Sequence, residues 1–191
     1  HMSTYLVCTG TRPEIIKMAP VYRLLKERGE TVQVLHTGQH EEMAHSLYRF
    51  FDMGPDHEMH LLREQPGLSQ LTAELLQGID QILAHTKPDV VLVQGDTSSA
   101  LVGAMAAYFR DIPVAHIEAG LRTGLHDPFP EEKHRELIGR LAHWHFPPTP
   151  QASDNLLREG VPKQDIYEVG NTVIDTALWV QQQGTELSRT S

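Results

Sequence analysis

The chain has 191 residues, of which 40% are hydrophobic and 21% charged, enough to bury the core of one globular domain. Acidic residues outnumber basic ones by 25 to 16, and the resulting net charge of −9 argues against nucleic acid and anionic membrane surfaces as partners. The longest apolar run, residues 100–109, is far shorter than the roughly 18–20 residues that a membrane-spanning helix needs.

The first elements predicted along the chain are a strand and a helix. His1-Met2 resembles a tag remnant, and no signal peptide is expected. Residues 4–9 predict a strand that holds the only cysteine, Cys8, as a buried thiol in a reducing compartment, the cytoplasm. Residues 10–14 predict a tight turn into a helix, in which Pro20 predicts a kink or break.

The next part of the chain predicts a second strand over 31–37 and a helix over 38–51. Residues 54–67 are expected to form a loop with a short strand in it. Leucine and isoleucine recur at helical spacing over 68–85, which predicts an amphipathic helix.

The centre of the chain predicts one βαβ unit. Residues 89–94 are continuously apolar and β-branched, as in a strand buried on both faces of a parallel sheet. A helix over 100–110 and a second short strand over 114–117 follow. Ligands of open parallel sheets bind at the carboxyl ends of the strands, so we expect Asp96 and Glu118, which follow the two strands, to face one crevice.

The alternation of strands and helices predicts an α/β fold with a doubly wound, Rossmann-like parallel sheet. Residues 3–183 are expected to form this domain, and 184–191 a linker or disordered tail. The elements predicted after the central unit are a loop over 121–130, a helix over 130–142, a strand over 144–146, a helix over 151–159, a strand over 165–169 and a helix over 171–183.

Two cations follow the first predicted strand. Backbone N–H groups at the start of a helix favour anions, Arg12 offers a fork that suits phosphate, and Lys17 lies one turn further on. The spacing matches neither a Walker A nor a G-x-G-x-x-G motif, so an ordinary turn with two solvated cations is the alternative. Arg122, which follows Gly120, is a further candidate for an anion site.

Three carboxylates could carry chemistry. Asp96 is either a helix-capping residue or a general acid or base, and Glu118 has the same two interpretations. Glu131 and Arg135 are four residues apart and therefore lie on one face of the predicted helix. They form either a surface ion pair of little energetic worth or a site in which the guanidinium holds the carboxylate in place. His116 lies inside a strand and is expected to be a packed core histidine.

Several longer motifs resemble a known family. The motifs are Gly10-Thr11-Arg12-Pro13-Glu14-Ile15-Ile16-Lys17, Gln94-Gly95-Asp96-Thr97, His116-Ile117-Glu118-Ala119-Gly120-Leu121-Arg122-Thr123, Pro130-Glu131-Glu132 and Gly170-Asn171-Thr172-Val173-Ile174-Asp175. In this order and spacing they resemble the non-hydrolysing UDP-N-acetylglucosamine 2-epimerases, over about residues 4–180. The resemblance implies one half of a two-domain, glycosyltransferase-B-like fold, with the active site between two Rossmann-like domains.

The resemblance also implies a reaction, the interconversion of UDP-GlcNAc and UDP-ManNAc, which are precursors of cell-surface polysaccharide. Asp96, Glu118 and Glu131 match the catalytic carboxylates of the family. The implied mechanism removes the proton at C2 and expels UDP from C1, and UDP adds back after C2 is reprotonated from the other face. No metal or redox cofactor is implied.

Further residues match binding positions of the family. Arg12 and Lys17 match contacts to substrate and nucleotide, and Arg135 matches a nearby arginine. Gln39 and His40 resemble part of a second, regulatory UDP-GlcNAc site. A homodimer is expected, because members of the family are usually dimers.

The chain departs from the family in two respects. His134 occupies a position that is usually Asn, and the second domain has no counterpart. We therefore expect the chain to be the amino-terminal domain of such an isomerase and to be inactive alone. The alternatives are a nucleotide-sugar-binding module, a hydrolysing relative that releases ManNAc and UDP, and a glycosyltransferase of the same fold, against which the motifs after residue 118 argue.

Overall fold

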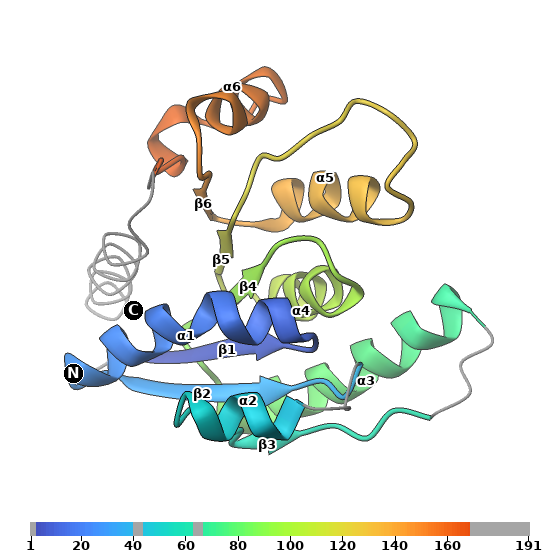
Figure 1. Cartoon of the computed structure of the whole chain (residues 1–191). Helices are drawn as coiled ribbons and strands as arrows, with labels where there is room; N and C mark the ends of the chain where they lie inside the picture. Colours follow the sequence, from blue (N-terminus) through green and yellow to red (C-terminus); the bar gives the residue numbers. More distant parts are fainter. Residues whose placement is uncertain (1–2, 40–43, 63–66, 169–191) are drawn as a thin grey trace.

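The computed structural model describes residues 3–39, 44–62 and 67–168, and the fold is reported for these residues. The described strands form one parallel sheet in the order β3-β2-β1-β4-β5-β6 (Figure 1). Their bounds are β1 Thr4–Thr9, β2 Thr31–His36, β3 His57–Glu58, β4 Val90–Gln94, β5 Val114–Ile117 and β6 Trp144–Phe146.

The chain starts in the middle of the sheet. It runs outward from β1 through β2 to β3, returns to β4 on the other side of β1, and runs outward again to β6. The order therefore reverses between β1 and β4. The carboxyl ends of the strands at such a reversal are the place where open parallel sheets bind ligands.

Helices cover both faces of the sheet, and each face has its own core. On one face, α1 and α2 pack against Tyr5 and Val7 of β1, and on the other α3, α4 and α5 pack against Leu6 and Cys8. Cys8 is fully buried, as predicted. The helix bounds are α1 Arg12–Glu27, α2 Ala44–Phe50, α3 Leu68–Thr86, α4 Ser98–Phe109, α5 Glu131–Leu141 and α6 Pro150–Arg158.

Most predicted elements are confirmed within one or two residues. The helix predicted over 38–51 is observed as α2 from Ala44, while residues 38–39 are not helical and 40–43 lie outside the described residues. The break predicted at Pro20 and the strand predicted over 165–169 are wrong. Helix α1 runs unbroken through Pro20, whose ring faces solvent. Ile16, whose carbonyl loses its helical donor to the proline, is also exposed, so water can replace the missing hydrogen bond. This exposed position explains why the predicted break does not occur.

The strand predicted over 165–169 is the second error. Lys163–Asp165 forms a 3-10 turn, and the chain pairs with β6 only through an isolated bridge between Ile166 and His145. The N–H of Tyr167 donates to the carbonyl of His145 at 2.8 Å. The turn takes up Asp165, the first residue of the predicted strand, and β6 is only three residues long, so it offers little edge for further pairing. The helix predicted over 171–183 and the tail after it lie outside the described residues.

A membrane-spanning helix must be both long and apolar. None of the helices of the described residues combines the length and the apolar character that crossing a bilayer requires.

Candidate functional site

Side chains from two strand ends and two helices meet at the carboxyl edge of the sheet. Lys17 comes from α1, Asp96 follows β4, and Glu118 follows β5. Helix α5 adds Glu131 and Arg135 in its first two turns. The predicted positions at the strand ends therefore coincide with the reversal in strand order.

Glu118 is held in an uncommon backbone conformation. Its φ of 66° lies in the left-handed region, which is costly for a residue other than glycine. Its backbone N–H donates to the carbonyl of Phe146 at 3.1 Å. Its Oε2 accepts hydrogen bonds from Lys17 Nζ at 2.7 Å and from Gln94 Nε2 at 2.6 Å. The surrounding contacts thus direct this carboxylate toward the cation of α1.

Asp96 is half-buried, and its pKa is raised from the ordinary value. Burial is the main cause of this rise in pKa, and the negative charges of Glu131 and Glu118 raise the pKa further. The positive charge of Arg135 lowers the pKa, and His134 lowers it weakly. Asp96 Oδ2 lies 3.5 Å from Arg135 Nη1, and the backbone carbonyl of Asp96 accepts from His134 Nδ1 at 3.0 Å. A raised pKa shifts this carboxyl group in the direction that suits a general acid or base.

Arg135 makes its closer contacts with Glu132, which the sequence placed in the Pro130-Glu131-Glu132 motif at the start of this helix but did not pair with Arg135. Glu132 Oε1 accepts from Arg135 Nε at 3.0 Å and from Nη2. Its carboxylate also accepts from the backbone N–H groups of Thr123 and Gly124 at 3.0–3.1 Å. Burial alone would raise the pKa of Glu132, but these hydrogen bonds outweigh it and lower the pKa to about 2.

Glu131 differs sharply from its neighbour. It is only half-buried, and its side chain makes no hydrogen bond within the described part of the chain. Its charge is nevertheless close enough to raise the pKa of Asp96. Two adjacent glutamates of α5 therefore have different surroundings: Glu132 is fixed by hydrogen bonds, and Glu131 is half-buried near Asp96.

The start of α1 already holds an anion, and this anion is Glu14. Its buried carboxylate accepts hydrogen bonds at 2.9–3.0 Å from the N–H groups of Gly10 and Thr11 and from the hydroxyls of Thr11 and Thr97. Burial still raises the pKa of Glu14, to about 7. The N–H groups of Gly10 and Thr11 are therefore engaged by the protein itself, and an anion site at the start of α1 stays a prediction. A capping-box pattern, Thr11 with Glu14 three residues on, would have predicted the contact.

Arg12 and Lys17 are the cations that α1 brings to this edge, and Lys17 is paired there with Glu118. Arg12 is exposed and lines a small pocket of about 220 Å³ with Pro13, Ile16 and Leu47. The assignment of both cations to substrate contacts stays a prediction.

Arg122 lies apart from the cluster of carboxylates. Its guanidinium binds both oxygens of Glu159, at 2.8 Å each, and the carbonyl of Leu121 at 2.9 Å. Only 8% of its side chain is exposed. This arrangement joins the end of β5 to α6, so the geometry gives Arg122 a structural role and does not favour its predicted contact with a ligand.

Gln39 is engaged at the start of α4. Its Oε1 accepts from the N–H of Ser99 at 3.2 Å and from the hydroxyl of Ser99 at 2.6 Å. His40, the other predicted residue of a regulatory site, lies outside the described residues. A regulatory site stays a prediction.

His116 is a packed core histidine, as predicted. It is fully buried, and its Nε2 donates to the carbonyl of Gly95 at 2.7 Å, which supports the turn before Asp96. Burial lowers the pKa of His116 to about 3, so the ring is neutral. Within the described ranges, no three His, Cys, Asp or Glu side chains are grouped as metal ligands.

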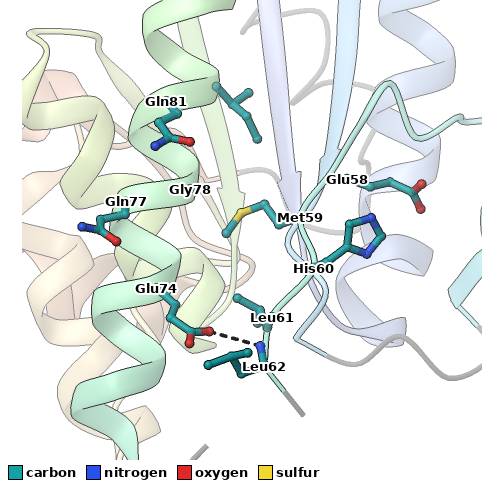
Figure 2. Close-up of a pocket in the computed structure, with 10 residues that line it drawn as sticks. Glu58, Met59, His60, Leu61, Leu62, Glu74, Gln77, Gly78 and Gln81 are labelled. Carbon is teal, nitrogen blue, oxygen red and sulfur yellow. Dashed lines mark hydrogen bonds between the residues drawn. The ribbon is translucent and has the colours of Figure 1, made fainter.

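A larger groove, of about 430 Å³, lies elsewhere, between residues 58–62 and α3 (Figure 2). Met59 points toward Gly78, where a Cβ atom would lie only 2.3 Å from Met59 Cε, and the N–H of Leu62 donates to Glu74 at 3.3 Å. The predicted site residues are absent from its lining, so its size does not make it the candidate site.

Comparison with known proteins identifies the family. The model of the family described as UDP-N-acetylglucosamine 2-epimerase matches residues 23–190. The chain belongs to this family. The UDP-N-acetylglucosamine 2-epimerase of Escherichia coli (strain K12) is 48% identical over 180 residues, which cover 93% of this chain and 48% of the relative.

Solved structures support the same family and the fold. The UDP-GlcNAc 2-epimerase of Neisseria meningitidis, bound to UDP-GlcNAc, matches with a TM-score of 0.84 at 39% identity, over 97% of this chain and 51% of the other. Acinetobacter baumannii MurG matches with a TM-score of 0.65 at 14% identity, over 91% and 47%, which shows the fold alone. The Rossmann-like half of a glycosyltransferase-B-like fold is thus confirmed. This epimerase-family chain spans about half the length of these relatives.

Proposed function

We propose that this chain is the amino-terminal domain of a non-hydrolysing UDP-N-acetylglucosamine 2-epimerase and supplies one half of its active site. The observation that carries the proposal is the convergence of Asp96, Glu118 and Glu131 at the reversal in strand order, with Lys17 bound to Glu118. The second half of the site comes from outside this chain, which spans half the length of its relatives.

The proposed reaction interconverts UDP-GlcNAc and UDP-ManNAc by elimination and re-addition of UDP. Removing the C2 proton from one face and returning it on the other requires more than one acid or base. Asp96, Glu118 and Glu131 have three different surroundings, which suits them to divide these steps. Arg12 and Lys17 stabilise the diphosphate as it leaves. The scheme uses no metal or redox cofactor.

Deuterium exchange at C2 tests the proposal. The full-length protein that contains this sequence is incubated with UDP-GlcNAc in deuterated water, and NMR follows C2 deuteration and UDP-ManNAc. We expect both in the unmodified protein and a loss of at least about 100-fold in Asp96→Asn, Glu118→Gln and Glu131→Gln. Glu136→Gln, which removes an exposed charge of α5 that pairs with Lys133, is the matched control and should retain full activity.

The products separate the alternatives. Free ManNAc with UDP would identify a hydrolysing relative. Binding of UDP-GlcNAc without C2 exchange would identify a binding module, and either result would overturn the proposed epimerisation.

We also propose a homodimer in the cytoplasm. Large apolar side chains are exposed on the helices of one sheet face, including Leu68 of α3, Phe109 of α4 and Leu137 of α5. Burying such side chains between two copies is favourable. The free, buried thiol of Cys8 suits a reducing compartment. Sedimentation of the full-length protein at twice the monomer mass would support the dimer, and sedimentation at the monomer mass would contradict it.

A further inference from the structure

Arg135 lies between two carboxylates that share it unequally. Glu132 receives Arg135 Nε at 3.0 Å and also Nη2, whereas Asp96 lies 3.5 Å from Nη1, at the limit of a hydrogen bond. Only 12% of the Arg135 side chain and 4% of the Glu132 side chain are exposed. The guanidinium is thus largely enclosed, and Glu132 and Asp96 are the carboxylates that contact it.

Glu132 is fixed independently of Arg135. The N–H groups of Thr123 and Gly124 hold its carboxylate at 3.0–3.1 Å, and it lies in the first turn of α5, where the helix dipole favours a negative charge. Removing or moving Arg135 would therefore leave Glu132 in place. Glu132 is the anchor, and Arg135 is the part that can move.

A full ion pair between Arg135 and Asp96 would disable Asp96 as a proton donor. Arg135 already lies at ion-pair distance from Asp96, at 3.5 Å, and opposes the rise in its pKa. A closer, two-pronged contact would lower that pKa further and favour the ionised carboxylate. We propose that Glu132 is a positioning residue, which holds Arg135 back from Asp96 and so leaves the Asp96 carboxyl group able to take up a proton. The proposal rests on the acid–base role of Asp96 stated above.

Other charged groups also face Asp96, and the variants proposed below leave them unchanged. Helix α5 contributes Glu131 and His134 beside Arg135, and the end of β5 contributes Glu118, which is paired with Lys17 of α1. The variants below alter none of these groups. A change in the titration of Asp96 then reports on Glu132 and Arg135.

A titration of Asp96 by carboxyl-carbon NMR in this 191-residue chain measures the effect directly. We expect Glu132→Gln to lower the pKa of Asp96 by about one unit, because Arg135 is released toward it. The control Glu136→Gln, on the same helix, should leave that pKa unchanged.

A double-mutant cycle separates movement of Arg135 from simple loss of a nearby charge. In an Arg135→Gln background, Glu132→Gln should lower the pKa of Asp96 by much less than in the unmodified chain. An equal fall in both backgrounds would mean that the charge of Glu132 acts directly, and this would overturn the proposal. So would an unchanged or raised pKa in Glu132→Gln.

A second variant covers the case in which Glu132→Gln does not fold. Glu132→Asp keeps the charge but is too short to hold both the loop and Arg135, so the pKa of Asp96 should still fall. No fall in that variant would also overturn the proposal. These titrations need no turnover. If they succeed while Asp96→Asn keeps full epimerase activity in the full-length protein, the proposed function fails and the positioning role stands.

Discussion

Gly120 shows how a single residue fixes the approach of α6 to the strand end before it. A Cβ atom there would lie 2.3 Å from the backbone carbonyl oxygen of Ala152, at a φ of +87°. Gly29 has a similar φ of +80° but open space around it, which makes it a matched control.

We expect Gly29→Ala to cost about 1 kcal/mol of unfolding free energy, from backbone strain alone. Gly120→Ala should cost about 1–3 kcal/mol more, because backbone rather than a flexible side chain must move. Urea unfolding of both variants measures the difference. Equal losses would show that the close approach at Gly120 adds nothing.

Glu132 should make stability depend on acid. Its pKa is about 2 in the folded chain and near 4.5 in an unfolded one. Its contribution is therefore complete above about pH 4.5 and is lost as the pH falls toward 2. Glu132→Gln should lose about 1.5–3 kcal/mol at neutral pH, the typical worth of hydrogen bonds to a charged group, and the deficit should shrink on acidification.

Unfolding by urea across this pH range checks the sign. A deficit that stays constant down to about pH 3 would contradict a depressed pKa for Glu132. Glu136→Gln again serves as the control, since its exposed pair with Lys133 should contribute little at any pH.

At the scale of elements, two helix caps that look alike in sequence should contribute differently to the free energy of unfolding. Thr97 and Thr149 each accept a hydrogen bond from the N–H three residues on, Ala100 and Ala152 respectively. Only Thr97 also donates, to the buried carboxylate of Glu14.

Replacing either threonine by alanine should cost about 1 kcal/mol for the lost cap. Thr97→Ala should cost about 1–3 kcal/mol more, because a buried acceptor loses one of its donors. Thermal and urea unfolding of the two variants test this ranking. A cost for Thr149→Ala as large as that for Thr97→Ala would contradict it.

Sequence patterns predicted the elements well where burial is continuous along the chain. The apolar run of β4 and the helical stripe of α3 are each contained in one continuous segment, so the segment alone predicts the element and its buried side. The strand predicted over 165–169 failed because its neighbour β6 is only three residues long and accepts a single bridge. That limit lies in the partner strand, outside the segment from which the prediction was made.

Some residues of the candidate site could be predicted from the sequence, and others could not. Asp96 and Glu118 were predicted because each directly follows a strand, and topology brings strand ends together. The local contacts of Glu14 with Thr11 follow a capping-box pattern that could have predicted them. The hydroxyl of Thr97 on Glu14 and the N–H of Thr123 on Glu132, however, come from other turns, which no local pattern connects to them. The partner of Arg122 is Glu159, which no local pattern connects to it.

At the scale of the whole molecule, this chain should bind UDP weakly and should not turn over substrate alone. Its net charge is −9, so affinity for a diphosphate depends on the local cations of α1. Calorimetric titration with UDP should show weak binding that Arg12→Ala reduces at least about tenfold, or about 1.4 kcal/mol. Arg23→Ala, an exposed arginine of the same helix, should have little effect. Formation of UDP-ManNAc by the chain alone would contradict its assignment as half of an active site.

The reversal in strand order also determines when the molecule can assemble. The centre of the sheet joins β1 to β4, and the N–H of Thr4 donates to the carboxylate of Asp89, 85 residues along the chain. During synthesis one edge of β1 therefore stays unpaired until β4 has left the ribosome. Such long-range pairing slows folding. The candidate site combines residues of α1 with residues that follow β4 and β5, so it cannot form before these strands have been synthesised. A nascent chain that stops before β4 therefore lacks the site and leaves one edge of β1 unpaired.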